Sequence, residues 1–135
     1  MSKAAVVFYS GSGNTEAMAD VIANALGADK IGAEAFDAAK AADYDAIAFG
    51  CPAMGDEVLE ETVFQPMWDD VKTGLAGKKV ALFGSYGWGD GQWMRDWEAD
   101  AQANGVTLAC ESVICNEAPD DEANAALEAL AKAIG

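Results

Sequence analysis

The 135-residue sequence contains no histidine and only three cysteines. Without histidine, the chain cannot build zinc sites of the cysteine–histidine type, Ser-His or Cys-His catalysis, or the usual general base of neutral pH. Cys51, Cys110 and Cys115 are odd in number and form no Cys-x-x-Cys pair, so a disulfide framework is not expected. We expect these cysteines to behave as small buried apolar residues.

Basic residues are scarce as well, with 8 Lys and Arg against 23 Asp and Glu and a net charge of -15. Such a charge repels the phosphates of nucleic acid, which is therefore not expected as a partner. It suits partner proteins with basic docking faces, because attraction would speed their association at low salt. A solubility role for the charge is the alternative, and composition leaves both open.

Long hydrophobic runs are also missing. No apolar stretch approaches the ~20 residues that span a bilayer, and Met1-Ser2-Lys3 leads into a strand pattern rather than a signal peptide. We therefore expect a cytoplasmic protein with no membrane association. The length, the 52% hydrophobic content and the lack of a linker predict one domain over residues 1–135.

Strand and helix patterns alternate along the chain. Apolar runs predict three buried strands, at residues 4–9, 45–51 and 78–84, a weak edge strand at 30–36 and a last strand at 106–115. Helical spacing predicts helices at 14–26 and 62–73, a short turn at 38–42, a helix carrying Trp93 and Trp97 in the core, and a closing helix capped near Pro119-Asp120. This is the pattern of an α/β fold, a doubly wound five-stranded parallel sheet with helices on both faces.

In such sheets ligands bind beyond the carboxyl ends of the strands, where the strand order reverses. Three glycine-rich segments follow the first, third and fourth predicted strands, at residues 10–15, 52–57 and 85–91. We therefore expect all three segments to meet in one crevice.

The first segment, Ser10-Gly11-Ser12-Gly13-Asn14-Thr15, leads directly into a predicted helix. Its glycines allow backbone N–H groups to turn inward, its hydroxyls and amide add donors, and the helix N-terminus adds partial positive charge. It has neither the lysine of a Walker A loop nor the third glycine of the dinucleotide fingerprint. The segment predicts a phosphate site, and an ordinary turn capped by Ser or Asn is the alternative.

The other two segments each carry one large side chain among glycines. They are Pro52-Ala53-Met54-Gly55-Asp56-Glu57 and Ser85-Tyr86-Gly87-Trp88-Gly89. Met54 and Trp88 are suited to enclosing a flat ring between them. Further along, Glu60 and Glu61 are expected to face solvent or to act as favourable charges near a helix start. A phosphate site, a flat ring and no metal ligands together suggest FMN.

Three runs resemble the FMN loops of the flavodoxins, specifically the short-chain clostridial type. They are YSGSGNTE at 9–16, GCPAMGDEVLEE at 50–61 and GKKVALFGSYGWGDG at 77–91. The resemblance covers the whole chain and implies the flavodoxin-like strand order 2-1-3-4-5, with FMN at the switch point. Related proteins often have Trp in place of Tyr9 and Thr in place of Ser12, and both changes preserve the chemistry.

The resemblance also implies roles for individual residues. The FMN phosphate is expected to be held by the side chains of Ser10, Ser12, Asn14 and Thr15 and by the backbone of Gly11 and Gly13. The ring is expected between Met54 and Trp88. The Gly55-Asp56 peptide is expected to flip, so that the Gly55 carbonyl accepts a hydrogen bond from the reduced N5–H. Glu57 is expected to accept one from N3–H, and the backbone of Gly87 and Gly89 is expected to face the pyrimidine edge. Asn116-Glu117 is expected to pass near the flavin.

The implied function is that of a low-potential one-electron carrier with non-covalently bound FMN, shuttling between semiquinone and hydroquinone. It would not be an enzyme, its partners would be ferredoxin-type oxidoreductases, and we expect a monomer. The main alternative is an FMN-dependent NAD(P)H or quinone reductase, which the minimal chain length disfavours. A phosphoacceptor domain would need acidic residues where Ser10 and Gly11 stand, and a non-flavin binding module would fail to bind FMN or riboflavin.

Overall fold

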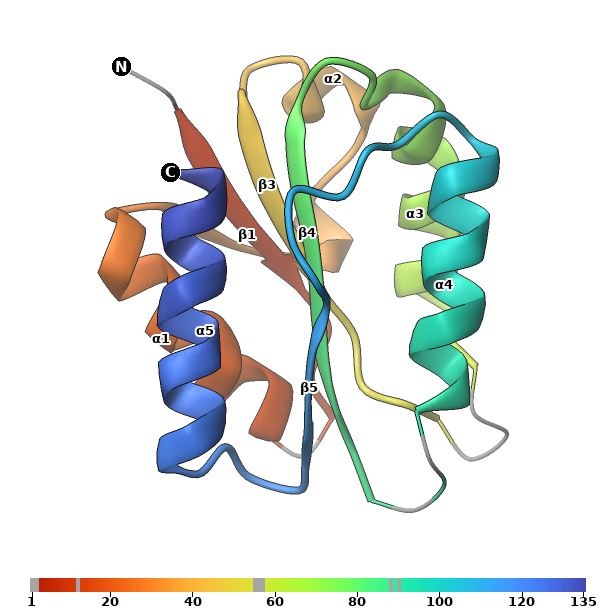
Figure 1. Cartoon of the computed structure of the whole chain (residues 1–135). Helices are drawn as coiled ribbons and strands as arrows, with labels where there is room; N and C mark the ends of the chain where they lie inside the picture. The colour runs from red at the N-terminus through yellow and green to blue at the C-terminus, as the bar shows by residue number, and fades with distance from the viewer. Residues whose placement is uncertain (1–2, 12, 55–57, 88, 90) are drawn as a thin grey trace.

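The computed structural model describes residues 3–11, 13–54, 58–87, 89 and 91–135. Within these residues, five parallel strands form one sheet in the order β2-β1-β3-β4-β5 (Figure 1). The strands are β1 (Ala4–Phe8), β2 (Asp29–Gly32), β3 (Ala46–Gly50), β4 (Lys79–Tyr86) and β5 (Val113–Asn116). Both the parallel pairing and the order implied by the resemblance are confirmed.

Helices cover both faces of this sheet, as the strand patterns predict. Figure 1 shows α1 and α5 on one face and α3 and α4 on the other. Their bounds are α1 (Asn14–Leu26), α2 (Ala38–Ala41), α3 (Phe64–Val71), α4 (Gln92–Ala103) and α5 (Asp121–Ile134), with 3-10 turns at Ala33–Ala35 and Lys72–Gly74. α5 begins where the sequence predicts, because the Asp120 carboxylate accepts the backbone N–H of Ala123 at its first turn.

Aromatic side chains fill the core between the sheet and the α3–α4 layer. Trp68 meets Phe49 and Trp97 edge to face, at centroid distances of 5.3 and 5.7 Å. Trp93 and Trp97 are 1% and 2% exposed, which confirms their assignment to the core. The opposite layer, under α1 and α5, is built mainly from smaller apolar side chains. The aromatic side chains therefore pack beneath α3 and α4, the two helices that follow the second and third glycine-rich segments.

The last strand is shorter than its apolar sequence predicts. Leu108 pairs with Val80 in an isolated bridge, and regular pairing resumes only where Val113 meets Phe83. Between these points β4 advances three positions, from 80 to 83, and the edge chain advances five, from 108 to 113. The two extra residues bulge out of the ladder. Here the Ser112 hydroxyl bonds Glu98 of α4 at 2.6 Å, so a contact with α4 replaces strand pairing.

Two further boundaries differ from the prediction. The expected strand at 30–36 ends at Gly32, because the chain turns there into a 3-10 helix that buries Ala33. β4 instead runs beyond its predicted end, so Ser85 and Tyr86, expected in a loop, are strand residues paired with β5. The glycine-rich segment after β4 therefore begins at Gly87.

The cysteines are free thiols, and Cys51 and Cys115 are buried while Cys110 is half-buried. Burial raises the pKa of the Cys51 thiol to about 12, so this side chain stays neutral. The prediction of buried apolar cysteines is confirmed for Cys51 and Cys115. Among the described residues, no helix combines the length and hydrophobicity needed to cross a membrane.

Candidate functional site

Segments that follow β1, β3, β4 and β5 meet at the carboxyl edge of the sheet. They line a cavity of about 230 Å³ formed by Asn14, Pro52, Ala53, Ser85, Tyr86, Gly87 and Glu117. All of these are predicted site residues except Glu117, which the resemblance only placed near the flavin. Each of the three glycine-rich segments contributes to this cavity: Asn14 comes from the first, Pro52 and Ala53 from the second, and Ser85, Tyr86 and Gly87 from the third.

The segment after β1 is ordered around the Ser10 hydroxyl. Its oxygen accepts the backbone N–H of Gly13 at 3.0 Å and that of Glu16 at 3.2 Å. A hydroxyl offers two acceptor positions and one proton, so these contacts leave its proton available to a ligand. Gly13 has φ 94°, a left-handed conformation that glycine adopts without strain, and it brings the chain into α1. Gly11 is exposed, and Ser12 lies outside the described residues.

Thr15, in the first turn of α1, carries an unpartnered polar atom. The residue is 1% exposed, and its Oγ1 has no hydrogen-bond partner among the described residues. A buried hydroxyl left without a partner destabilises the fold by about 1–3 kcal/mol, so such groups are uncommon. A helix N-terminus is also where backbone N–H groups attract anions. The segment thus has the donor set of a phosphate site.

The segment after β3 begins as a continuation of the sheet. Cys51 donates its N–H to Phe83 at 3.2 Å, and Ala53 donates to Ser85 at 3.0 Å. Met54 donates to the Val58 carbonyl at 3.0 Å, which brings the two ends of the loop together. Pro52, Ala53 and Met54 are half-buried. The predicted flip at Gly55-Asp56 and the predicted bond from Glu57 concern positions outside the described residues.

The end of β4, Ser85 and Tyr86, and the residue that follows it, Gly87, also line the cavity. The Ser85 hydroxyl donates to the Glu117 carbonyl at 2.6 Å, so this side chain connects β4 to the chain after β5. Tyr86 is half-buried, Gly87 lines the cavity, and Gly89 is exposed with φ 89°. Trp88, the predicted ring-stacking side chain, lies outside the described residues.

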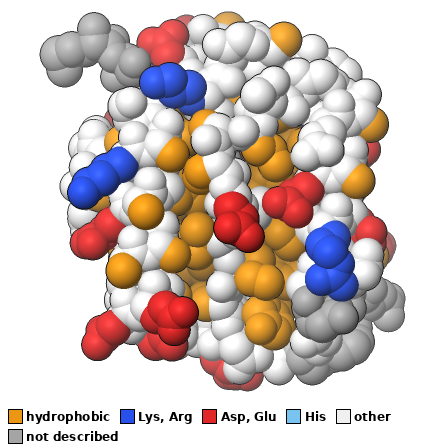
Figure 2. Space-filling view, viewed as in Figure 1, with side chains coloured by type: hydrophobic (Ala, Val, Ile, Leu, Met, Phe, Trp, Pro, Cys, Tyr) orange, Lys and Arg blue, Asp and Glu red, His pale blue; other side chains and the backbone are white. Residues whose placement is uncertain are grey.

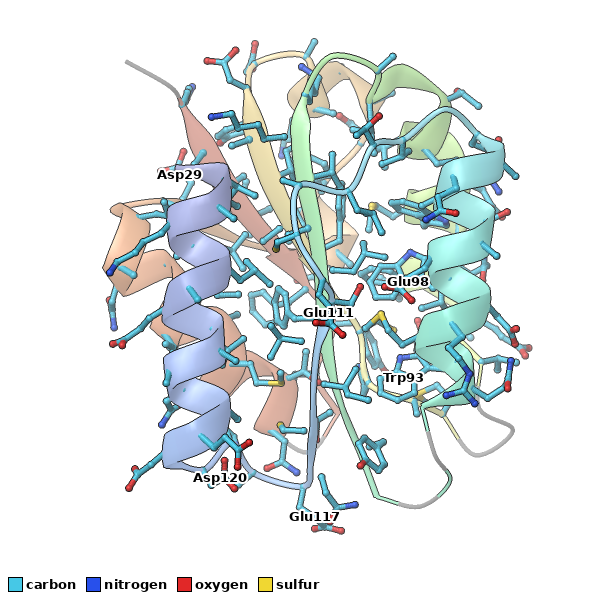
Figure 3. All side chains as sticks on the ribbon, in the orientation of Figure 1. Asp29, Trp93, Glu98, Glu111, Glu117 and Asp120 are labelled. Carbon is cyan, nitrogen blue, oxygen red and sulfur yellow. The ribbon has the colours of Figure 1, made fainter. Side chains whose placement is uncertain are left out.

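Glu117 forms the remaining wall, just beyond β5 at the lower edge of Figure 3. It has φ 59°, a left-handed conformation unusual for a residue with a side chain, and its N–H bonds the Tyr86 carbonyl at 2.8 Å. Unusual backbone conformations of this kind are concentrated at functional sites. The sequence pointed to Asn116-Glu117 only through the resemblance. The sequence feature that could have identified Glu117 as a site residue is its position directly after the last strand, at the same edge of the sheet.

Glu60 differs from the prediction that it faces solvent. It is 4% exposed, and its carboxylate accepts the backbone N–H groups of Thr62, Val63 and Phe64 at 2.6–2.9 Å and the Thr62 hydroxyl. Burial alone would raise the pKa of this carboxyl, but the hydrogen bonds outweigh it and lower the pKa to about 2. The alternative prediction, a favourable charge at a helix start, is correct. Glu60 fixes the start of α3 directly after the second loop.

Five parallel strands in this order, with a cavity at the carboxyl edge built from the loops after β1, β3 and β4, define the flavodoxin-like class of doubly wound proteins. A family model described as Flavodoxin matches residues 6–130. The chain is 44% identical over 121 residues to a flavodoxin of Clostridium beijerinckii, covering 86% of this chain and 88% of that protein. It is 44% identical over 135 residues to a flavodoxin of Megasphaera elsdenii, covering 95% and 98%.

Solved structures agree with the sequence matches. The solution structure of two-electron reduced Megasphaera elsdenii flavodoxin matches with a TM-score of 0.85 and 42% identity, over 96% of this chain and 98% of that one. The chain belongs to the flavodoxin family. Flavodoxins are electron-transfer proteins rather than enzymes, they act with redox partner proteins, and the family implies a flavin cofactor. This favours the expectation of an electron carrier over that of a reductase.

Proposed function

We propose that this chain binds FMN non-covalently at the cavity and carries single electrons at low potential between partner proteins. The observation that carries the proposal is the Thr15 hydroxyl, which is buried at a helix N-terminus, has no hydrogen-bond partner among the described residues, and follows Asn14, a lining residue of the cavity. Bound FMN would supply the redox chemistry, accepting and releasing one electron at a time, while the protein binds, orients and tunes it.

The proposed phosphate end consists of hydroxyl, amide and backbone donors with no basic side chain. Its members are Ser10, Gly11, Ser12, Gly13, Asn14 and Thr15. The proposed ring contacts come from the other two loops and are Pro52, Ala53, Met54, Gly55, Asp56, Glu57, Ser85, Tyr86, Gly87, Trp88 and Gly89. Six members of these sets, Asn14, Pro52, Ala53, Ser85, Tyr86 and Gly87, line the cavity, which supports the assignment.

The charges around the cavity support a low potential. Glu117 contributes a carboxylate, and no Lys or Arg is among the described residues that line the cavity. Gaining an electron adds negative charge, which nearby carboxylates and a net charge of -15 disfavour. The same charge suits redox partners with basic docking faces, such as ferredoxin-type oxidoreductases.

The proposal is tested by replacing Thr15 with Val, which preserves shape and removes the hydroxyl. Loss of one hydrogen bond to a charged phosphate is worth about 1.5–3 kcal/mol, so the Kd for FMN should rise at least about tenfold. The Kd for riboflavin, which lacks the phosphate, should stay unchanged. The apoprotein should unfold at the same or a higher urea concentration, because an unpartnered buried polar atom is gone.

Thr107→Val is the matched control, since Thr107 is exposed and precedes the bridge at Leu108, near the opposite end of β4. It should leave both Kd values unchanged. Equal weakening of FMN and riboflavin binding by Thr15→Val would contradict the assignment of Thr15 to the phosphate. Wild-type protein that binds neither flavin would contradict the proposed function itself.

A further inference from the structure

We propose that Trp93 is a positioning residue for the cofactor site, because its indole N–H holds the loop after β3 against the start of α4. The inference rests on the proposed function, since it concerns the two loops assigned to the FMN ring. It assigns a role to a side chain that lines no part of the cavity and that the sequence indicated only as core.

Trp93 is the second residue of α4, directly after the loop that follows β4, and it is 1% exposed. Its Nε1–H donates to the Cys51 carbonyl oxygen at 3.1 Å, in a fully buried bond. Cys51 is the residue immediately before Pro52, where the other loop begins. Figure 3 shows Trp93 at the lower end of α4, on the side that faces the sheet.

Two neighbours keep this bond in place. A Cβ at Gly84 would overlap the Cys51 carbonyl oxygen and approach the Trp93 ring to 3.0 Å, so glycine leaves the space in which the bond forms. On the other side, the Trp93 ring lies 5.7 Å from the Tyr86 ring, between centroids. Tyr86 and Pro52 both line the cavity. Trp93 therefore packs against one lining residue, Tyr86, and bonds the residue that precedes another, Pro52.

The same helix provides an internal comparison. Trp97 lies one turn later, is 2% exposed, and packs edge to face against Phe64 and Trp68. Its Nε1 has no hydrogen-bond partner among the described residues. Both indoles therefore fill the same core, but only that of Trp93 bonds the base of a cofactor loop. Replacing each with Phe separates the hydrogen bond from the packing.

If a loop adopts its ligand-binding conformation for only a fraction of the time, the apparent affinity for the ligand falls in proportion to that fraction. A buried hydrogen bond that favours the competent arrangement therefore strengthens binding without touching the ligand. By reciprocity, bound FMN must strengthen the Trp93–Cys51 bond by the same factor.

The experiment compares Trp93→Phe with Trp97→Phe. We expect the Kd values for FMN and riboflavin to rise together by about three- to tenfold in Trp93→Phe, because the bond supports ring loops and one hydrogen bond is worth about that factor. Trp97→Phe should stay within about twofold of wild type, allowing for general loss of packing. The separation between the two midpoint potentials of bound FMN should change only in Trp93→Phe. Equal effects of the two variants on both readouts would overturn the inference.

A second measurement uses wild-type protein and does not depend on the folding of any variant. Hydrogen exchange of the two indole N–H groups is followed by NMR with and without FMN. FMN should slow exchange at Trp93 several-fold more than at Trp97, and equal slowing would overturn the inference. Failure of the wild type to bind FMN would instead defeat the proposed function, so the two failures are distinguishable.

Discussion

Glu60 is a charged side chain with almost no solvent contact, and its hydrogen bonds make it sensitive to pH. The pKa of its carboxyl falls from 4.5 to about 2 in the folded protein. A carboxyl with a lowered folded-state pKa stabilises the fold fully above its unfolded pKa. That contribution should decline as the pH falls below about 4.5 and vanish near pH 2.

Glu60→Gln should lower the free energy of unfolding by about 1–2 kcal/mol at pH 7, because a neutral amide accepts hydrogen bonds less strongly than a carboxylate. The difference from wild type should shrink as the pH is lowered from 4.5 toward 2. Urea unfolding at several pH values measures both effects. Glu61→Gln is the control, since Glu61 is exposed, and an equal effect in that neighbour would contradict the account.

The burial of Glu60 shows what local sequence leaves undetermined. Glu57, Glu60 and Glu61 form an acidic stretch that normally faces solvent, and nothing in that stretch singles out Glu60. What distinguishes it is the set of unpaired N–H groups at the start of α3, which exists only once the helix has formed. The first loop was easier to predict, since its glycines, hydroxyls and helix start are adjacent in sequence.

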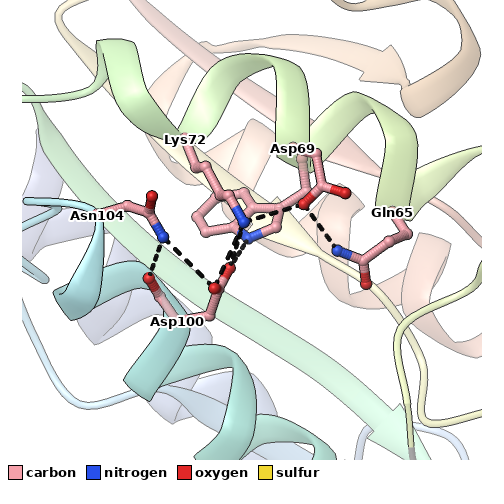
Figure 4. Close-up of polar contacts among 6 residues, drawn as sticks. Gln65, Asp69, Lys72, Asp100 and Asn104 are labelled. Atoms are coloured by element: carbon pink, nitrogen blue, oxygen red, sulfur yellow. Dashed lines mark hydrogen bonds and ion pairs between the residues drawn. The ribbon is translucent and has the colours of Figure 1, made fainter.

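At the scale of elements, α3 and α4 are joined by a polar network on their outer side (Figure 4). Lys72 lies 3.0 Å from Asp69 and 3.1 Å from Asp100, and Asp100 also accepts the indole N–H of buried Trp68 at 2.8 Å. Burial tends to raise the pKa of the Asp100 carboxyl, but its bonds to Trp68 and Lys72 lower it overall. This network links α3 and α4, the helices that follow the second and third glycine-rich segments.

Asp100→Ala should destabilise the protein by about 1–3 kcal/mol, because it leaves the buried Trp68 donor without an acceptor. Asp69→Ala is the matched variant, since it removes a partly exposed ion pair with Lys72 and an exposed hydrogen bond from Gln65, and exposed pairs of this kind are worth about 0–1 kcal/mol. Thermal and urea unfolding of both variants test the difference. Equal destabilisation by the two variants would show that the hydrogen bond from Trp68 to Asp100 adds nothing to the stability of the protein.

β5 illustrates why the sequence predicted the elements better than their ends. The apolar residues from Val106 to Cys115 fit a strand, and the last part does pair with β4. The break arises because an edge strand has one neighbour, so a side-chain contact such as that of Ser112 with Glu98 competes with pairing. The central strands are covered on both faces and have a neighbour on each side, so their core segments were predicted correctly, although β4 continues to Tyr86, two residues past its predicted end.

At the scale of the whole molecule, acidic side chains predominate over basic ones, and Figure 2 shows both kinds scattered over one face. A net charge of -15 should accelerate association with positively charged proteins, and salt should screen that attraction.

Electron transfer from the FMN-loaded protein to a small basic haem protein should therefore slow by about ten- to a hundredfold between ~20 mM and ~0.5 M salt. Stopped-flow absorbance measures the rate. The control is the same haem protein with its lysines acetylated, which should react slowly and show little salt dependence. A salt dependence that persists after acetylation would argue against steering by charge.

The central claim is that the protein binds FMN and transfers its electrons one at a time. The most direct test is an anaerobic dithionite titration of the FMN-loaded protein followed by visible absorption. The account predicts two well-separated one-electron steps, the second at much lower potential. A single two-electron step would contradict it and favour reductase chemistry, and loss of FMN during the titration would contradict the assignment of the site.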